Sequence, residues 1–247
     1  MATDPRAAYA TITDGPSDLV GDEIMNVTPV VIDGVELHLA KALPGVLDYV
    51  TVARAEERAN QLRPILLEGL DYLGPVPYQP DASRSIEFLA TGGTVVASAV
   101  GGLEAFANHH LASFCAPPMY NLEGELGGAE PAVLVCGEEL TFRQLADKPL
   151  NDRLGKIIPE LKQTPRPTSE PWWRKLRQIQ ALAALHRHGI TDPVSRKGLE
   201  GVKSLTQRFC DREYAGAAAM MLSVFEFISP GWVGEQRALH LPQPPGE

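Results

Sequence analysis

Most of the chain shows the spacing of hydrophobic and polar residues that is typical of amphipathic helices. Hydrophobic residues recur every three or four positions from residue 44 to 73 and from 83 to 115, so both stretches are predicted helices. Pro64 should begin a second helix or kink the first. The residues expected on the inward faces are Leu47, Val50, Ala53, Glu57 and Leu62 in the first stretch and Val96, Val100, Leu103, Ala107 and Phe114 in the second.

The second predicted helix contains four glycines that lower its intrinsic stability. Each costs roughly 1 kcal/mol relative to alanine in a helix interior. We therefore expect a neighbouring helix to approach closely at these positions, which are Gly92, Gly93, Gly101 and Gly102.

The second half of the chain predicts three further helices, at residues 149–161, 171–189 and 209–228. A proline-rich linker precedes the middle one, for which Ser169 is a suitable N-cap and Gly189 a suitable C-terminal residue. The expected fold class is therefore mainly α, a single bundle of up-and-down helices.

Two short stretches alternate between polar and hydrophobic residues in the manner of strands. Residues 25–40 flank Asp33 and Gly34, a pair that favours a tight hairpin turn. A second hairpin or an irregular segment is expected around Gly137. The domain prediction is a flexible N-terminal arm at 1–22, one helical domain at 23–229 and a disordered tail at 230–247.

Composition narrows the class of protein. Hydrophobic residues make up 44% of the 247 residues and charged residues 21%, as in ordinary globular proteins. The three cysteines are widely separated, which argues against a disulfide framework and a zinc site, and no metal or cofactor is expected. The apolar run at 214–228 is too short to span a membrane and the N-terminus lacks a secretory pattern, so we expect a cytoplasmic protein without membrane contact.

Charge is distributed unevenly along the chain. The net charge is −9, but residues 143–212 carry 15 Lys and Arg against 7 Asp and Glu, which gives +8 there and −17 elsewhere. One interpretation is that the 143–212 segment binds RNA or a nucleotide. The other is that the basic and acidic parts face each other within the fold or across a dimer.

Specific catalytic motifs are absent from the sequence. It contains no phosphate-binding glycine loop, serine-hydrolase elbow, zinc-protease motif or calcium loop. Paired Glu-x-x-His motifs of di-iron bundles are also absent.

Two histidines on different predicted helices, His110 and His186, are expected to face the core. They would meet in a polar pocket and act as general acid or base, or each would be a hydrogen-bonded core residue. Glu104 and Asn108, four residues apart, lie on the flank of the same stripe as His110. Asn108 is either a ligand contact or a helix-to-helix hydrogen bond.

The helix at 171–189 begins with aromatic and basic residues. Trp172 either stacks on a nucleotide base or anchors the start of the helix to the core. Arg174 and Arg177 either bind phosphate or form a solvated helix face.

Three segments together resemble bacterial proteins with a HEPN-like bundle, where HEPN stands for higher eukaryotes and prokaryotes nucleotide-binding. They are VGGLEAFANHHLASF, LADKPLNDRLGKIIPEL and PWWRKLRQIQALAALHRHG, and the resemblance covers about residues 85–229. It implies a metal-independent ribonuclease of defence or toxin systems that forms a homodimer through its third helices. The family hallmark is an arginine followed by a polar residue and, after four to six intervening positions, a histidine near the end of that helix.

His188 lies where the histidine of this family would fall, but Ala183 stands in place of the arginine. The resemblance therefore implies a noncatalytic member that binds a partner protein or an anionic ligand. One alternative is a ribonuclease with a rearranged site, in which His186 or His188 acts with Arg187 or Arg177. The other is a purely structural interaction module.

Overall fold

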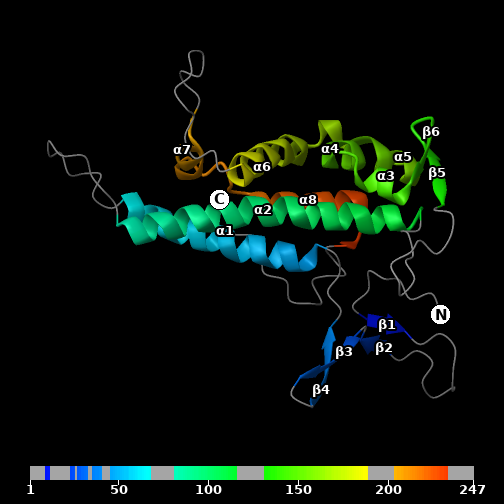
Figure 1. Cartoon of the computed structure of the whole chain (residues 1–247), viewed down its shortest axis with the longest axis horizontal. Helices are drawn as coiled ribbons and strands as arrows, with labels where there is room; N and C mark the ends of the chain where they lie inside the picture. Colours follow the sequence, from blue (N-terminus) through cyan, green and yellow to red (C-terminus); the bar gives the residue numbers. More distant parts are fainter. Residues whose placement is uncertain are drawn as a thin grey trace.

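The computed structural model is mainly helical, as predicted, with three two-stranded antiparallel sheets among the described residues (Figure 1). It describes residues 9–11, 23–25, 27–32, 35–40, 45–67, 81–115, 131–188 and 203–232. The helices are α1 (Val46–Leu67), α2 (Ala82–Ala112), α3 (Phe142–Ala146), α4 (Leu150–Asp152), the π-helical turn η1 (Arg153–Ile157), α5 (Ile158–Lys162), the 3-10 turn η2 (Pro167–Ser169), α6 (Pro171–Arg187), α7 (Leu205–Cys210) and α8 (Ala217–Ile228).

Helix α2 forms the centre of the bundle. It packs along α1 on one side and against α6 on the other, and α8 contacts α1, α2 and α6 (Figure 1). Its buried residues include Val96, Val100, Leu103 and Ala107, so the predicted stripe is confirmed there, whereas Phe114 is 39% exposed. By length and composition, α2 is also the one described helix that is long and apolar enough to cross a membrane. Half of its most apolar stretch is buried within the bundle, as in the core helix of a globular protein.

The predicted inward face of α1 is confirmed at Ala53 and Leu62, which are buried, and was wrong at Leu47 and Glu57. Leu47 is 67% exposed and Glu57 is exposed, whereas the adjacent Glu56 is buried. Polar and apolar residues are mixed around α1, so the pattern did not determine which face packs. Pro64 lies inside α1 and begins no new helix.

Three of the four glycines in α2 meet a neighbouring side chain, as predicted. A Cβ atom added at Gly92 would lie 2.8 Å from the Phe209 ring, and one at Gly93 would collide with the ring of His186. At Gly102 it would lie 2.5 Å from the Cβ of Asp48. Only Gly101 faces open space, so the prediction of close packing was wrong at that position.

The final helix predicted at 209–228 is broken in the structure. Helix α7 ends at Cys210, and a turn over residues 211–216 leads into α8. Arg212 and Gly216 both have positive φ angles, of 59° and 80°, which a continuous right-handed helix does not allow.

A buried carboxylate from α1 holds the start of α8. Glu56 is 1% exposed and accepts hydrogen bonds from the backbone N–H groups of Gly216 and Ala218, the latter at 3.1 Å. The first N–H groups of a helix have no partner within it, so Glu56 satisfies donors that would otherwise be buried unpaired. It thereby joins α1 to the turn before α8.

The hairpin expected at residues 25–40 is confirmed as β3 (Val27–Ile32) and β4 (Val35–Ala40), with Ile32 opposite Val35. Asp33 and Gly34 lie outside the described residues. Strand β1 (Tyr9–Thr11) pairs with β2 (Glu23–Met25), so part of the predicted flexible arm is a strand. The rest of that arm is outside the described residues.

The alternative of a second hairpin is confirmed by β5 (Ala132–Val135) and β6 (Glu138–Thr141). Its two-residue turn has positive φ angles at Cys136 (53°) and Gly137 (78°), as in a type I′ turn.

Both ends of α6 differ in part from the prediction. The N-cap is Glu170 rather than Ser169, which lies in η2. Helix α6 ends at Arg187, and Gly189 is outside the described residues. Trp232, near the start of the predicted tail, is buried at 2% exposure with its ring centroid 4.5 Å from that of Phe225, and the residues after it lie outside the described ones.

Candidate functional site

The two histidines that one interpretation places in a shared pocket lie far apart. His110 is 5% exposed and its ring packs edge-on against Phe106, with centroids 4.5 Å apart. The ring of His186 lies instead against Gly93 and the residue is exposed. Since Gly93 and His110 are 17 residues apart on α2, the two histidines are separated by about 25 Å along that helix. The composite catalytic pocket was therefore a wrong prediction.

The error has a simple physical reason. His186 does continue the inward stripe of α6, because it faces α2 at Gly93. It lies in the last turn of α6, however, where packing no longer covers the side chain on all sides. Helical periodicity predicts which neighbour a residue faces, and it does not predict how much of that residue is covered.

Glu104 and Asn108 do lie together, and their neighbour is an arginine that the sequence analysis did not select. The side chain of Arg153 is 5% exposed and donates a hydrogen bond of 2.6 Å from Nη1 to Oδ1 of Asn108. Its Nη2 lies 3.7 Å from Oε1 of Glu104. Burial lowers the pKa of Arg153, and the charges of Glu104 and Asp147 oppose that effect.

The contacts of Arg153 with Asn108 and Glu104 connect η1 to α2. Arg153 begins η1, where the wider π-helical turn changes the direction of side chains relative to an α-helix. For Asn108, the structure therefore supports the helix-to-helix hydrogen bond. The signal in the sequence was weak, because one arginine among the apolar residues of 149–161 is ordinarily exposed.

Trp172 is an anchor in the core rather than a platform for stacking. It is 8% exposed, and its ring contacts those of Trp173 and Phe227 with centroids 5.7 and 5.6 Å apart. The side chain of Trp173 in turn lies over Gly155 of η1. The interpretation that Trp172 stacks on a base was therefore wrong.

The solvent side of α6 carries exposed basic residues. We call Arg174, Arg177 and His188 the basic face, whereas Arg187, in the last turn of α6, lies about 80° to 140° away from them around the helix axis. All four are exposed, and the sequence of α6 contains no acidic residue. Within the described residues, none of the three arginines forms an ion pair. At 100° per residue, Arg174, Arg177 and His188 fall within about 60° of one another, along about 21 Å of the helix.

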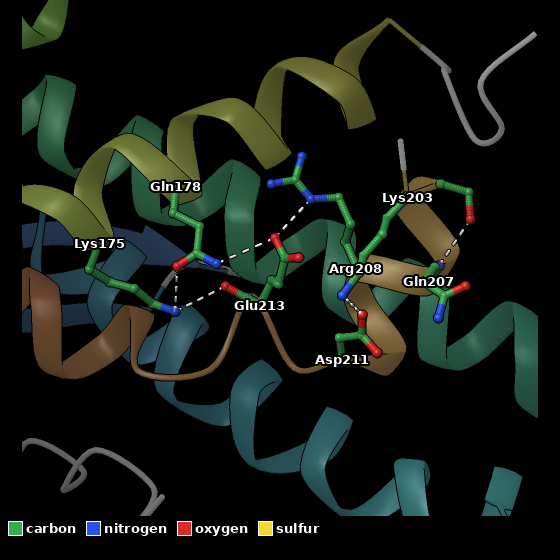
Figure 2. A network of polar contacts seen from close by, with 8 residues as sticks. Lys175, Gln178, Lys203, Gln207, Arg208, Asp211 and Glu213 are labelled. Atoms are coloured by element: carbon green, nitrogen blue, oxygen red, sulfur yellow. Dashed lines mark hydrogen bonds and ion pairs between the residues drawn. The ribbon is translucent and has the colours of Figure 1, made fainter. Parts of the chain in front are cut away.

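The cations beside the basic face are, by contrast, engaged within the protein (Figure 2). Lys175 Nζ donates to the backbone oxygen of Glu213 at 3.0 Å. Arg208 Nε donates to Oε2 of Glu213 at 2.8 Å, and Lys203 pairs with Asp211 at 2.6 Å. Among these neighbouring cations and those of α6, Arg174, Arg177 and Arg187 form no ion pair within the described residues.

Within the part of the chain that the structure describes, no group of three His, Cys, Asp or Glu side chains could hold a metal ion. The chain matches no family model, no curated protein and no solved structure in the three comparisons made. The geometry of the residues is thus the basis for a functional proposal.

Proposed function

We propose that this chain is a noncatalytic helical protein that binds an anionic ligand, with RNA as the class best suited to its charge, through the basic face of α6. The observation that carries the proposal is the set of exposed arginines, Arg174, Arg177 and Arg187, on a helix without an acidic residue. Guanidinium groups bind phosphate oxygens with charge-assisted hydrogen bonds. When an arginine neutralises a phosphate, the counterion held by the nucleic acid is released, and this release favours binding.

The arrangement of the histidines supports a role without catalysis. His110 and His186 are about 25 Å apart along α2, so they do not form a composite acid–base site. Ala183, where the resemblance would require an arginine, is 6% exposed and belongs to the core. A fixed cation to stabilise a phosphoryl transition state is therefore missing from this position.

The test is binding of a labelled single-stranded RNA of about 12 nucleotides, a length within the usual range for single-strand sites. We expect Arg174→Gln/Arg177→Gln to weaken binding about tenfold and to reduce the salt slope by about 1.4, since each lost phosphate contact contributes about 0.7. Fluorescence anisotropy over a salt series measures both quantities.

The matched control is Arg54→Gln/Arg84→Gln, which removes the same charge from exposed positions on α1 and α2. It should change the affinity less than twofold at about 0.15 M salt, where distant charges are screened. Equal loss of binding in both double variants would contradict the assignment to α6. Cleavage of the RNA, abolished by His186→Ala or His188→Ala, would favour a ribonuclease instead.

A further inference from the structure

The chain places one of its own carboxylates in a site suited to an anionic ligand. Two side-chain donors from different elements converge on Oε2 of Glu213, Arg208 Nε at 2.8 Å and Gln178 Nε2 at 3.3 Å. Lys175 Nζ lies against the backbone oxygen of the same residue at 3.0 Å. A guanidinium and an amide around one oxygen are the groups with which proteins also hold phosphate or carboxylate ligands.

This cluster borders the basic face. Lys175 and Gln178 directly follow Arg174 and Arg177 in α6, and Figure 2 shows both reaching from α6 toward Glu213. The side chains of Arg208 and Glu213 are only 24% and 20% exposed, so their ion pair is partly shielded from water. Without the carboxylate of Glu213, the positive surface of α6 would extend onto Arg208.

The backbone of the turn that carries Glu213 is held independently of this side chain. The N–H group of Gly216, at the end of the turn, donates to the buried carboxylate of Glu56. The N–H of Glu213 itself donates to the carbonyl oxygen of Arg208 at 2.9 Å. A change of the Glu213 carboxylate to an amide is therefore compatible with the same fold.

We infer that Glu213 is an internal anion that shields Arg208 and so limits the number of phosphates that the basic face of α6 can bind. The inference rests on the proposed function. Glu213 competes with an incoming phosphate for Arg208, and its neutralisation adds a phosphate contact next to Arg174 and Arg177.

The experiment compares Glu213→Gln with the wild-type protein, using the same labelled RNA and salt series. We expect binding to tighten about three- to tenfold and the salt slope to become steeper by about 0.7, as for one additional phosphate contact. The control Glu87→Gln makes the same change in net charge and frees Arg58, its partner at 2.6 Å on the α1–α2 surface. That control should change the affinity less than twofold.

A second variant separates the shielding of Arg208 from a general charge effect. Arg208→Gln/Glu213→Gln should return both the affinity and the salt slope to wild-type values. The inference is overturned if Glu213→Gln behaves like Glu87→Gln, or if the double variant keeps the gain. Loss of binding that is equal in the α6 variant and its charge-matched control would instead overturn the proposed function. Far-UV circular dichroism and thermal unfolding verify that each variant is folded.

Discussion

At the scale of single residues, Glu56 shows how burial and hydrogen bonding act against each other on one carboxyl group. Burial raises its pKa above the ordinary value of 4.5, although the N–H groups of Ala218 and Gly216 and the charges of Lys175 and Arg212 favour the ionised form. A group whose pKa is raised by folding binds its proton more tightly in the folded state. Its stabilising contribution is then complete below about pH 4.5 and is lost as the pH rises through the raised pKa.

Comparison of the wild-type protein with Glu56→Gln tests this effect, because glutamine does not titrate. We expect the free energy of unfolding of the wild type to fall relative to that of the variant as the pH rises from about 4 to about 8. Urea unfolding at each pH measures the difference. Glu57→Gln, a change at the exposed neighbour, should show no such trend. A difference that grows in favour of the wild type with pH would mean that the two backbone hydrogen bonds outweigh burial.

The candidate site could be predicted from sequence only in part, and the reason differs from residue to residue. Arg174 and Arg177 were selected because they are basic residues near the start of a predicted helix, and the structure leaves both exposed. Arg153 was not selected, because its burial depends on a π-helical turn that has no sequence signal of comparable strength. Glu213 was not selected because its partner Arg208 depends on the break between α7 and α8.

At the scale of elements, three glycines of α2 lie against a side chain of a neighbouring element, and the fourth faces open space. Gly102 faces Asp48 of α1 and Met221 of α8, with an added Cβ 2.5 and 2.8 Å from their nearest atoms. The adjacent Gly101 faces open space. Two neighbouring glycines in one helix therefore carry opposite expectations for the same substitution.

We expect Gly101→Ala to stabilise the protein by about 0.5–1 kcal/mol, since alanine has the higher helix propensity. Gly102→Ala should destabilise it by about 1–3 kcal/mol, because the Cβ of Asp48 is fixed to its backbone and α1 must shift away. Urea unfolding followed by far-UV circular dichroism gives both values. Stabilisation by both substitutions would show that α1 and α8 move aside at little cost.

Element type was predictable wherever periodicity and end signals agreed. Long apolar stripes in the sequence correspond to the helices α2 and α6. A glycine that permits a positive φ angle, Gly137, corresponds to the turn of the β5–β6 hairpin. The break between α7 and α8 was missed because the apolar residues from 209 to 228 favour one continuous helix. The positive φ angles of Arg212 and Gly216 interrupt it, and the buried carboxylate of Glu56 holds the start of α8.

At the scale of the whole molecule, α8 determines whether the helices from residue 45 to 232 behave as one unit. Seven of its twelve residues are buried, and it contacts α1, α2 and α6. Separation of any of these helices would expose part of that apolar surface to water, at about 25 cal/mol for each Å². We therefore expect this part of the chain to unfold in a single cooperative transition.

Tryptophans on two sides of α8 make this expectation measurable. Trp232 packs with Phe225, whereas Trp172 and Trp173 report on α6, where Trp172 contacts Phe227. The double variant Trp172→Phe/Trp173→Phe retains the fluorescence of Trp232 alone. The variant Trp232→Phe retains the fluorescence of Trp172 and Trp173 on α6.

In each variant, the midpoint of urea unfolding from tryptophan fluorescence should coincide with the midpoint from far-UV circular dichroism, as two-state unfolding requires. The substitutions lower stability because phenylalanine leaves space in the core, so the two probes are compared within a variant rather than between variants. Separate midpoints would divide the bundle into two units, with α6 unfolding apart from the helices around Trp232. Since the basic face lies on α6, separate unfolding of α6 would mean that the residues proposed to bind the ligand belong to a helix that can detach from the rest of the bundle.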